Sequence, residues 1–408
     1  MNWTNCARRT LFSVVLLISA CRQQDPAGTG SQPPAFPRSG NVTHGCIQVF
    51  DAGKDYFPEK VTPEYAKTFT VEYHRSYKVV TVRPGSDRGP EERYILLQCG
   101  APKPSLGNHL NAATVISIPI SSLFAGSSSH HPLLVDLDRL DVLTGMPKHE
   151  FATMPEIIDR IKAGKVIEYG ENIVNVEKVI LAAPSMLMVS DAGSPSYAAL
   201  RSAGVPVVHN TEWLEDTAMG RAEWVKFLAL FLNEEGKARH VFDMVRDRYE
   251  SLAGRTRNIP RKDRPKVMTG GVFRGIFSVA GGRSYVARLI DDAGADYLWS
   301  DDDSTGYTNI DIETVLVRAA SADYWLNGGI WPNLEVMLND DPRYKEFKAY
   351  RTGQVWLYNR KLNATGSYDY WGRGVTRPDL ILADMIKIFH PDLARDHEFE
   401  WYKQVPAR

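Results

Sequence analysis

The sequence is poor in cysteine. It has 4 cysteines in 408 residues, and none of them forms a Cys-x-x-Cys pair or a cluster. Iron–sulfur and structural zinc sites are built from such clusters, so the sequence argues against both. Histidine is scarce as well, and the adjacent His130 and His131 cannot easily face one metal centre. A bare metal ion is therefore disfavoured as a ligand, with haem ligation by one of these histidines left as an alternative.

The sequence also lacks familiar catalytic motifs. It has no P-loop, no Gly-x-Gly-x-x-Gly after a strand, no nucleophile elbow and no paired acid with a partnered histidine. Lys and Arg number 48 against 49 Asp and Glu, so no overall field attracts nucleic acid. A hydrophobic content of 43% over this length suffices for two lobes with cores of their own. These features favour a binding protein over an enzyme or a nucleic-acid-binding protein.

Long apolar runs are missing near the N-terminus. Residues 11–18 follow two arginines and are apolar, but they are too short to span a bilayer. Small residues then precede Cys21, a pattern that resembles a bacterial lipobox. The resemblance implies a signal peptide at residues 1–20 and a lipid on the Cys21 sulfur, which anchors the chain to a membrane in the periplasm or at the cell surface. An ordinary secretory signal with a coincidental cysteine is the alternative.

Two cysteines remain for the folded body. Residues 21–41 are rich in Gln, Pro, Gly and Ser, which predicts a flexible tether. Cys6 leaves with the signal peptide and Cys21 is the expected anchor, so Cys46 and Cys99 remain. An oxidising compartment favours a disulfide between them, although two independent buried thiols also fit the spacing.

The most informative feature that is present is an internal repeat. A capped helix with a glutamate near its start runs into an apolar strand at residues 175–189, and the same order recurs at residues 311–326. Each unit is followed by a helix that ends at glycine and by another short strand. Ahead of the units, strands at residues 115–119 and 267–269 are expected to lead into small-residue loops. Three matched pairs in one order predict two similar lobes with a cleft between them.

Short apolar strands that alternate with helices predict parallel sheets covered on both faces. Right-handed crossovers then give two Rossmann-like α/β lobes that bind ligand at the carboxyl ends of the strands. A helix that precedes a strand begins at that same edge, which places Glu177 and Glu313 on the rims of the two lobes. The helix dipole is a sufficient reason for one such glutamate, but not for a symmetric pair.

A helical stretch joins the two halves. Between Thr217 and Leu252, apolar residues recur every three or four positions, which predicts two amphipathic helices with a break near Asn233. A long rigid helix of this kind limits the relative motion of the lobes. An extra β-rich portion precedes the repeat, and a tail of unclear role begins at His390. The predicted boundaries are an N-terminal lobe at 42–233 with the β-rich extension at 42–104, an interlobe helix and linker at 234–264, and a C-terminal lobe at 265–408.

The sequence resembles the substrate-binding lipoproteins of bacterial ABC importers for metal chelates. The resemblance spans about residues 114–393 and is carried by the leader, the repeat, the rim glutamates and the run Gly220-Arg-Ala-Glu-Trp-Val-Lys-Phe. It implies the class III periplasmic binding protein fold and a monomer that captures a ferric siderophore, with cobalamin or haem as alternatives. It also implies an ABC permease with ATPase subunits as partner, whose arginines receive Glu177 and Glu313.

The loops after the predicted strands supply the candidate ligand contacts. Their aromatic and polar side chains suit a large organic molecule. Arg274 follows a Gly-Gly turn and can meet a carboxylate or hydroxamate oxygen, or else form a salt bridge. Trp213 and Trp331 can clamp the ligand, or else belong to the core. The full set of candidates is Ser121, Ser122, Trp213, Arg274, Tyr285, Trp331 and Tyr370.

Two other classes of protein remain as alternatives. A chelatase-like enzyme shares the bilobal layout, but the missing catalytic motifs and the secretory leader argue against it. A non-transport sensor lipoprotein has the same layout and makes no contact with a permease.

Overall fold

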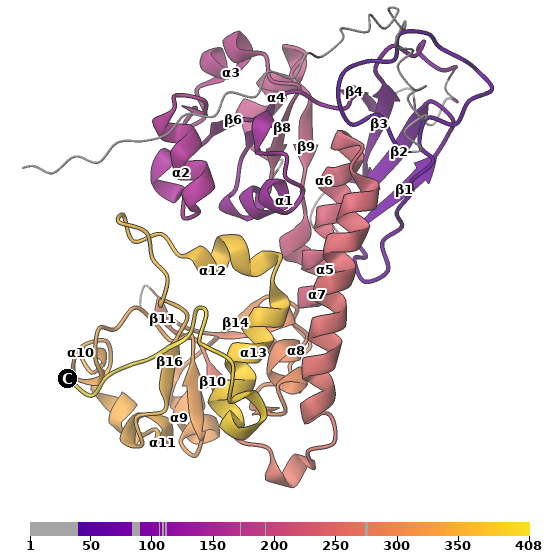
Figure 1. The fold of residues 1–408 in the computed structure, drawn as a ribbon. Helices are drawn as coiled ribbons and strands as arrows, with labels where there is room; N and C mark the ends of the chain where they lie inside the picture. The colour runs from indigo at the N-terminus through magenta and orange to yellow at the C-terminus, as the bar shows by residue number, and fades with distance from the viewer. Residues whose placement is uncertain are drawn as a thin grey trace, which may run out of the picture. The chain divides into compact units, whose positions relative to one another are not determined.

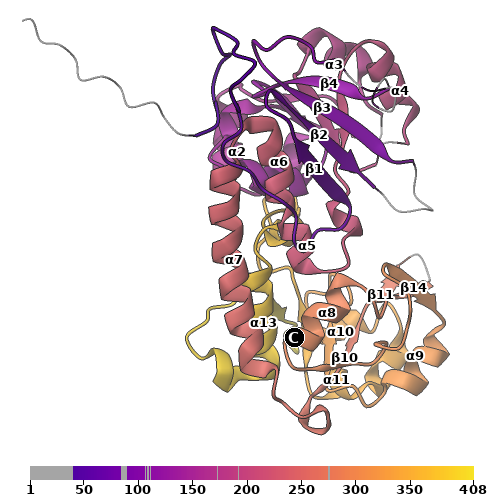
Figure 2. The same ribbon diagram turned by 90° about the vertical axis from the view of Figure 1, so that its right-hand side faces the viewer.

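The computed structural model describes residues 40–83, 90–105, 107, 110, 112–171, 173–191, 193–273 and 276–408. The predicted signal peptide, Cys21 and Arg274 lie outside these residues. The described residues form four β-sheets with helices around them (Figures 1 and 2).

The strands are short, with two to seven residues each. In chain order they are β1 (Phe69–Tyr73), β2 (Tyr77–Val82), β3 (Glu92–Gln98), β4 (Thr114–Ile118), β5 (Leu123–Ala125), β6 (Leu143–Met146), β7 (Ile167–Glu168), β8 (Met186–Val189), β9 (Val207–His209), β10 (Lys266–Thr269), β11 (Gly271–Phe273), β12 (Ile276–Ala280), β13 (Asp296–Tyr297), β14 (Tyr307–Ile310), β15 (Tyr324–Leu326), β16 (Val355–Leu357) and β17 (Lys403–Gln404).

The α-helices vary from one turn to six. They are α1 (His131–Asp136), α2 (Pro155–Lys162), α3 (Val176–Ala182), α4 (Pro195–Ser202), α5 (Ala218–Ala222), α6 (Trp224–Leu232), α7 (Glu235–Thr256), α8 (Tyr285–Asp292), α9 (Ile312–Ala319), α10 (Leu334–Met337), α11 (Lys348–Arg351), α12 (Asp369–Gly372) and α13 (Pro378–Phe389).

Two sheets form the two lobes. The sheet of lobe 1 has the order β7-β6-β5-β8-β9 and is parallel throughout. The sheet of lobe 2 has the order β13-β10-β15-β16-β17, in which only the edge strand β17 is antiparallel. Four consecutive strands match, with β5, β6, β8 and β9 equivalent to β10, β13, β15 and β16, while β7 and β17 are additions at opposite edges. The predicted α/β class with two similar lobes is therefore confirmed. A smaller antiparallel sheet, β11-β12-β14, follows β10 in lobe 2.

One of the three predicted matches between the lobes is wrong, because it used the wrong strand as the first strand of lobe 1. The expected strand at residues 115–119 is β4, and it pairs with β3 in the sheet of the extension. Its residues alternate between exposed and buried, as in a sheet with one solvated face. The true counterpart of β10 is β5, whose three residues are all buried. A strand covered on both faces is continuously apolar, and this distinction separates the two segments.

The predicted β-rich extension supplies β1, β2 and β3 of the remaining sheet, and β4 completes it. This sheet packs on α6, which is buried along all nine of its residues. The ring of Phe69 lies 5.0 Å from that of Trp224 and 5.3 Å from that of Phe227. The prediction of an amphipathic helix was therefore wrong for α6, since a helix that is apolar on every side must be covered on every side. The extension is part of that cover.

Two buried carboxylates accept hydrogen bonds from the backbone of the segment that leads into β1. Glu223 is fully buried, accepts backbone N–H groups from Glu64, Tyr65 and Ala66, and forms a 2.6 Å ion pair with Lys226. Glu215 accepts the next two N–H groups along the same segment, at residues 67 and 68. Hydrogen bonds to ionised groups are the strong ones, so this segment is fixed to the helices.

A buried lysine makes the second connection. Lys78 of β2 is completely buried and donates to the Glu235 carboxylate, to the Leu230 carbonyl and to the Asn233 side chain. Asn233 has φ +59°, a left-handed conformation that suits asparagine and ends α6 where a break was predicted. The predicted tether included Asn41, but the side chain of Asn41 donates to the Glu235 carboxylate over 2.7 Å, so this residue belongs to the fold.

The two ends of the described chain are tied into the fold. Cys46 and Cys99 form a disulfide that joins the first part of the extension to the end of β3. At the other end, the fully buried Asp384 of α13 accepts backbone N–H groups from residues 400, 401 and 402. Trp401 and Tyr402 are buried as a result. The C-terminal tail is therefore part of lobe 2.

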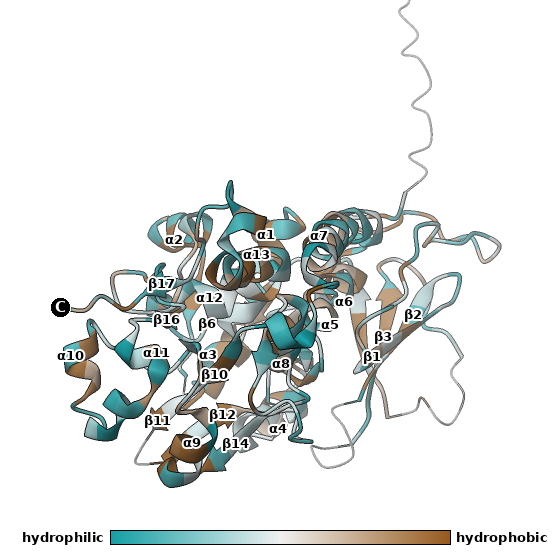
Figure 3. Ribbon diagram, turned by 90° about the horizontal axis from the view of Figure 1, so that it is seen from below, coloured by the Kyte–Doolittle hydropathy of each residue, from teal (hydrophilic) through white to brown (hydrophobic). Residues whose placement is uncertain are grey.

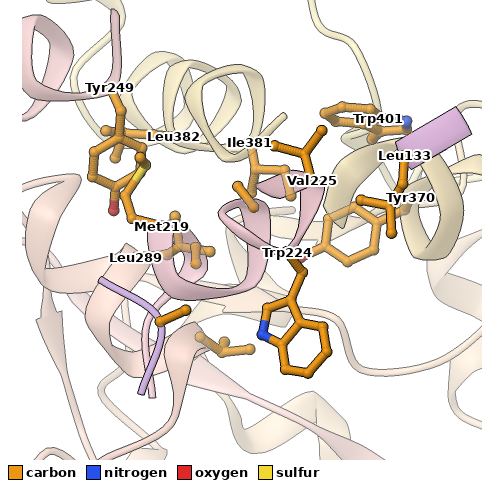
Figure 4. Packing of buried hydrophobic residues seen from close by; sticks show 14 of the residues in the cluster. Leu133, Met219, Trp224, Val225, Tyr249, Leu289, Tyr370, Ile381, Leu382 and Trp401 are labelled. Atoms are coloured by element: carbon orange, nitrogen blue, oxygen red, sulfur yellow. The ribbon is translucent and has the colours of Figure 1, made fainter. Parts of the chain in front are cut away.

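One apolar core runs through both lobes. The 22-residue α7 packs against α6 and, further along, against α13. The same buried cluster takes in residues from lobe 1, from the helices at the junction and from lobe 2, as Figure 4 shows for Leu133, Met219, Trp224, Val225, Tyr249, Leu289, Tyr370, Ile381, Leu382 and Trp401. No helix of the described part of the chain is long and apolar enough to cross a membrane.

We predict that Lys78→Met destabilises the protein by about 3 kcal/mol, because it leaves the carboxylate of Glu235 buried without its cation. Denaturant unfolding measures this free energy. The double variant Lys78→Met with Glu235→Gln is expected to recover part of the loss. Lys60→Met, which removes an exposed ion pair with Asp55, is the control and is expected to change the free energy of unfolding by less than about 1 kcal/mol. Equal effects of Lys78→Met and Lys60→Met would contradict the assignment.

Candidate functional site

A pocket of about 300 Å³ lies at the carboxyl ends of β10, β15 and β16 in lobe 2. This is the edge at which parallel α/β sheets bind ligands. Its lining contains glycines, small polar residues, aliphatic side chains and four aromatic side chains, and it includes no Asp, Glu, His, Lys or Arg among the described residues. The pocket therefore offers aromatic and backbone contacts to a ligand.

The floor of the pocket is made of backbone. Gly270 and Gly271 follow β10, and Gly328 and Gly329 lie after β15. Gly270 has φ +87°, and a Cβ at Gly271 would lie 1.6 Å from the Gly328 carbonyl oxygen. Only glycine allows the ends of the two strands to approach this closely. The indole of Trp325 donates to the Gly270 carbonyl over 2.8 Å and holds the first turn in place.

Aromatic side chains form the walls. Tyr358 comes directly after β16, and its ring stacks on Tyr370 with 4.4 Å between centroids. Trp371 meets Tyr358 edge-on at 5.3 Å. Tyr307 at the start of β14 is 63% exposed, while Tyr370 is only 3% exposed and lies beneath Tyr358. Burial raises the pKa of Tyr370 well above its usual value, so it stays neutral and supports the wall.

The strand ends of lobe 1 carry polar groups. The carbonyl of Ser190, which follows β8, lies 3.0 Å from His209 Nε2 and accepts a 3.0 Å hydrogen bond from the Trp213 indole. Trp213 is 46% exposed and follows β9, so its predicted position at a strand exit is correct. There is no room for a side chain at Gly126, which follows β5, since a Cβ there would lie 2.6 Å from the Met188 carbonyl oxygen.

The adjacent histidines of lobe 1 are buried. His130 and His131 are 0% and 3% exposed, and His130 Nδ1 and His131 Nε2 have no hydrogen-bond partner among the described residues. Burial lowers the pKa of His130 to about 3 and that of His131 to about 4, so both are neutral at neutral pH. Across the described ranges, no group of three or more His, Cys, Asp or Glu side chains is arranged to hold a metal ion.

Three of the predicted ligand contacts lie elsewhere. Ser121 and Ser122 precede β5 and bond to Ser185, which precedes β8. They occupy the amino ends of the strands, opposite to the ligand-binding edge, because the predicted strand before them belongs to the extension. Trp331 is 5% exposed, packs against Trp325 and donates to Asp340. It is a core residue.

Tyr285 lies where the lobes meet. It begins α8, and the Arg221 guanidinium lies 4.6 Å from its ring centroid. Arg221 in turn forms a buried 2.7 Å ion pair with Glu212, which follows β9. Burial raises the pKa of Tyr285. The phenol is therefore neutral, and the arginine connects a strand exit of lobe 1 to the first turn of a helix in lobe 2.

A bridging segment, residues 363–373, reaches from lobe 2 to lobe 1. The side chains of Asn363, Thr365 and Ser367 all donate to the Glu150 carbonyl, over 2.7 to 3.0 Å. Figure 1 shows α12, which belongs to this segment, between the two lobes. The three donors converge on one acceptor, so this contact fixes the position of lobe 2 against the loop before α2.

The second half of the bridging segment adds charged contacts. Asp369 accepts from the Thr153 hydroxyl and from the Trp401 indole, each over 2.9 Å, and so joins the two lobes through one carboxylate. Arg373 forms a 2.9 Å ion pair with Asp136 of α1. Trp371, which lines the pocket, and Tyr370, which lies beneath Tyr358, stand between these anchors in the sequence. One segment thus contributes both to the pocket and to the contact between the lobes.

The predicted rim glutamates stand at equivalent places. Glu177 lies in the first turn of α3 and Glu313 in the first turn of α9, and both are exposed. Each helix is capped by the side chain of the residue two positions before the glutamate, and α3 and α9 feed the equivalent strands β8 and β15. Glu313 forms a 2.5 Å ion pair with Arg343, whereas Glu177 has no ion pair among the described residues.

The sequence also matches a known protein family. Residues 154–362, a little over half of the chain, match the family model described as periplasmic binding protein. The chain belongs to that family. An uncharacterized lipoprotein of Methanocaldococcus jannaschii is 26% identical over 328 residues, which cover 76% of this chain and 75% of the relative.

Solved structures show the same fold. A periplasmic binding protein of Veillonella parvula superposes with a TM-score of 0.55 at 14% identity, covering 79% of this chain and 98% of that one. A Helicobacter pylori protein solved with Ni(II) bound gives a TM-score of 0.53 at 15% identity, covering 69% and 88%. The family consists of periplasmic binding proteins, which bind solutes and are not enzymes.

Most of the lining lies where the sequence indicated ligand contacts. The glycines of the floor and Tyr358 follow predicted strands, and Tyr307 and Trp371 lie in segments near them. Tyr368 was missed, because it belongs to the bridging segment, which has no counterpart in lobe 1.

We predict that the protein loses stability as the pH falls below about 6.5. At pH values between the lowered pKa values of His130 and His131 and the ordinary value of 6.5, the unfolded chain binds more protons than the folded one. The free energy of unfolding is therefore highest above pH 6.5 and decreases by roughly 2 kcal/mol per histidine by about pH 5. Urea unfolding at about pH 7 and about pH 5 measures the change. A variant with both histidines replaced by glutamine is expected to lose much less over this interval, and an unchanged loss would contradict the prediction.

Proposed function

We propose that this chain is the substrate-binding lipoprotein of an ABC importer for a large metal-bearing organic chelate of the ferric-siderophore type. The observation that carries the proposal is the pocket at the ligand-binding edge of lobe 2, with its glycine floor and aromatic walls. Such a surface suits the organic shell of a chelate, which offers flat and apolar faces. The same role with cobalamin or haem as ligand is the alternative.

The chemistry of the lining favours a chelated metal over a bare one. A bare divalent cation requires carboxylate, imidazole or thiolate ligands, and the described lining of the pocket has none. A metal that is already saturated by its own organic ligand requires none. The structure with Ni(II) shares the fold of this chain, which supports a metal-bearing ligand in this fold. We further propose that Arg274 supplies the cation for an acidic group of the chelate, and that Trp213 contacts the ligand from lobe 1.

Delivery follows capture. We propose that lipid on Cys21 anchors the monomer to the membrane, and that Glu177 and Glu313 dock on basic residues of the permease. The lobes hold the chelate through aromatic contacts and do no chemistry on it. ATP hydrolysis by the ATPase subunits then drives release into the permease. Because α7 and the bridging segment link the lobes, the motion between the empty and loaded states is small.

An absorption spectrum of the protein purified from its own host identifies the ligand. A broad ferric-chelate band supports the siderophore type, a corrin spectrum indicates cobalamin and a Soret band indicates haem. A colourless protein whose melting temperature is unchanged by a ferric siderophore, cobalamin and haem would contradict the proposal of a metal chelate.

We predict that Tyr307→Ala weakens binding of whichever of these three compounds the protein takes by about tenfold. Tyr307 is the most exposed aromatic residue of the described lining, so its loss removes contact area with little effect on folding. Quenching of tryptophan fluorescence during titration with the compound gives the Kd. Tyr307→Phe keeps the ring and is expected to bind within about twofold of wild type. If Tyr307→Ala binds as tightly as wild type, the ligand lies elsewhere.

We predict that reversing the charge of Glu177 and Glu313 together abolishes uptake of the chelate and leaves the Kd for the chelate unchanged. The glutamates are exposed and are not part of the described pocket lining, so the loss lies in docking. Uptake of the labelled compound by cells with the double variant is the measurement. Reversal of Glu156 and Glu335, exposed acids in the first turns of α2 and α10, is the control. Normal uptake with Glu177→Lys and Glu313→Lys would disprove the docking assignment.

A further inference from the structure

The most exposed apolar side chains of the described residues are not spread evenly. Val317 is 89% exposed, Leu181 is 87% exposed and Ile173 is 84% exposed. Single exposed apolar residues are common on protein surfaces. Two of these three, however, lie on α3 and α9, the helices that carry the rim glutamates.

Leu181 and Val317 occupy equivalent positions in the two lobes. Leu181 comes four residues after Glu177, and Val317 comes four residues after Glu313. Residues four apart lie on the same face of a helix, one turn from each other. The residues between them match as well, since Val179 and Val315 are both fully buried. Each helix therefore presents an acid and, one turn further, an apolar side chain on its outer face.

The rest of the exposed set does not share this pairing. Ile173 lies four residues before Glu177, but the corresponding residue before Glu313 is the polar Asn309. Val49 is 82% exposed and lies in the extension, which has no counterpart in lobe 2. The repeat thus keeps the acid and the apolar residue together in both lobes, while other exposed apolar residues occur once.

The two helices also lie on the same side of the unit formed by residues 40–408. In Figure 2, α7 lies on the left, and α3 and α9 both lie to its right, with α9 at the right-hand edge; Figure 3 shows strongly hydrophobic colour on α9 at the edge. One partner can therefore reach both helices at once. A partner with two equivalent binding places, related by a twofold axis, would meet the same pair of side chains at each place.

We propose that Leu181 and Val317 are part of the docking surface, and that the partner is a twofold permease with an apolar pocket beside a basic residue at each of its two binding places. This inference rests on the proposed function, because it adds a second contact to the docking of the glutamates. The acids steer the approach and set its orientation, since charged contacts act at a distance and are screened by salt. The apolar side chains supply contact that salt does not weaken.

Binding to the transporter in nanodiscs tests the inference. The full chain is titrated against its permease with the ATPase subunits, and the Kd is measured at low and at high salt. Leu181→Gln with Val317→Gln is expected to raise the Kd at least about tenfold and to keep the salt dependence of wild type. Glu177→Gln with Glu313→Gln is expected to raise the Kd and to reduce that salt dependence. Glutamine is a good helix former, and thermal unfolding checks that the variants fold.

Val49→Gln, which changes an equally exposed apolar residue outside the repeat, is the control and is expected to bind as wild type does. If the leucine–valine variant binds normally while the glutamate variant does not, this inference is wrong and the proposed docking stands. If both variants bind normally, the docking assignment itself is wrong. An effect of Val49→Gln as large as that of the paired variant would also overturn the inference, because the loss of binding would then not be specific to the two equivalent positions of the repeat.

Discussion

Charged groups are buried beside the central helices, and the fold depends on giving each of them a partner. Glu223 and Glu235 are fully buried, as is Lys78 of the extension. An unpaired charge in such a place costs several kcal/mol. Glu223 pairs with Lys226 of α6 and accepts backbone N–H groups from the extension, and Glu235 pairs with the lysine of the extension. The extension is therefore a structural requirement of α6 and α7, and the disulfide and the packing of Phe69 reinforce the same contact.

Much of this architecture could be predicted from the order of the elements. The repeat of a capped helix and a buried strand located α3, β8, α9 and β15, because helix caps and apolar strands are local features. The failures concern tertiary context. The strand β4 was assigned to lobe 1 because its own residues do not show which strand it pairs with. The predicted positions of Ser121 and Ser122 at the ligand-binding edge were wrong for the same reason. Only the alternation of exposed and buried residues in β4 distinguishes it from β5.

The candidate site was harder to predict than the fold. Its floor follows from the order of the elements, because Gly270 and Gly328 come after β10 and β15, which are neighbouring parallel strands. Its walls do not, since Tyr307 and Trp371 come from segments that occur only in lobe 2. Trp331 illustrates the opposite error, because a tryptophan near a strand end reads the same in the sequence whether it faces a cleft or, as here, packs against Trp325 in the core.

The bridging segment bears on how the transporter can tell a loaded binding protein from an empty one. The lobes are joined by α7, by a continuous apolar core and by the convergence of three side chains on the Glu150 carbonyl. Trp371 lines the pocket and lies on the bridging segment, and Tyr370 beside it stacks on Tyr358. On the proposed function, a ligand in the pocket would therefore contact the same segment that joins the lobes. Its presence would be signalled by a firmer contact between the lobes rather than by a large closure.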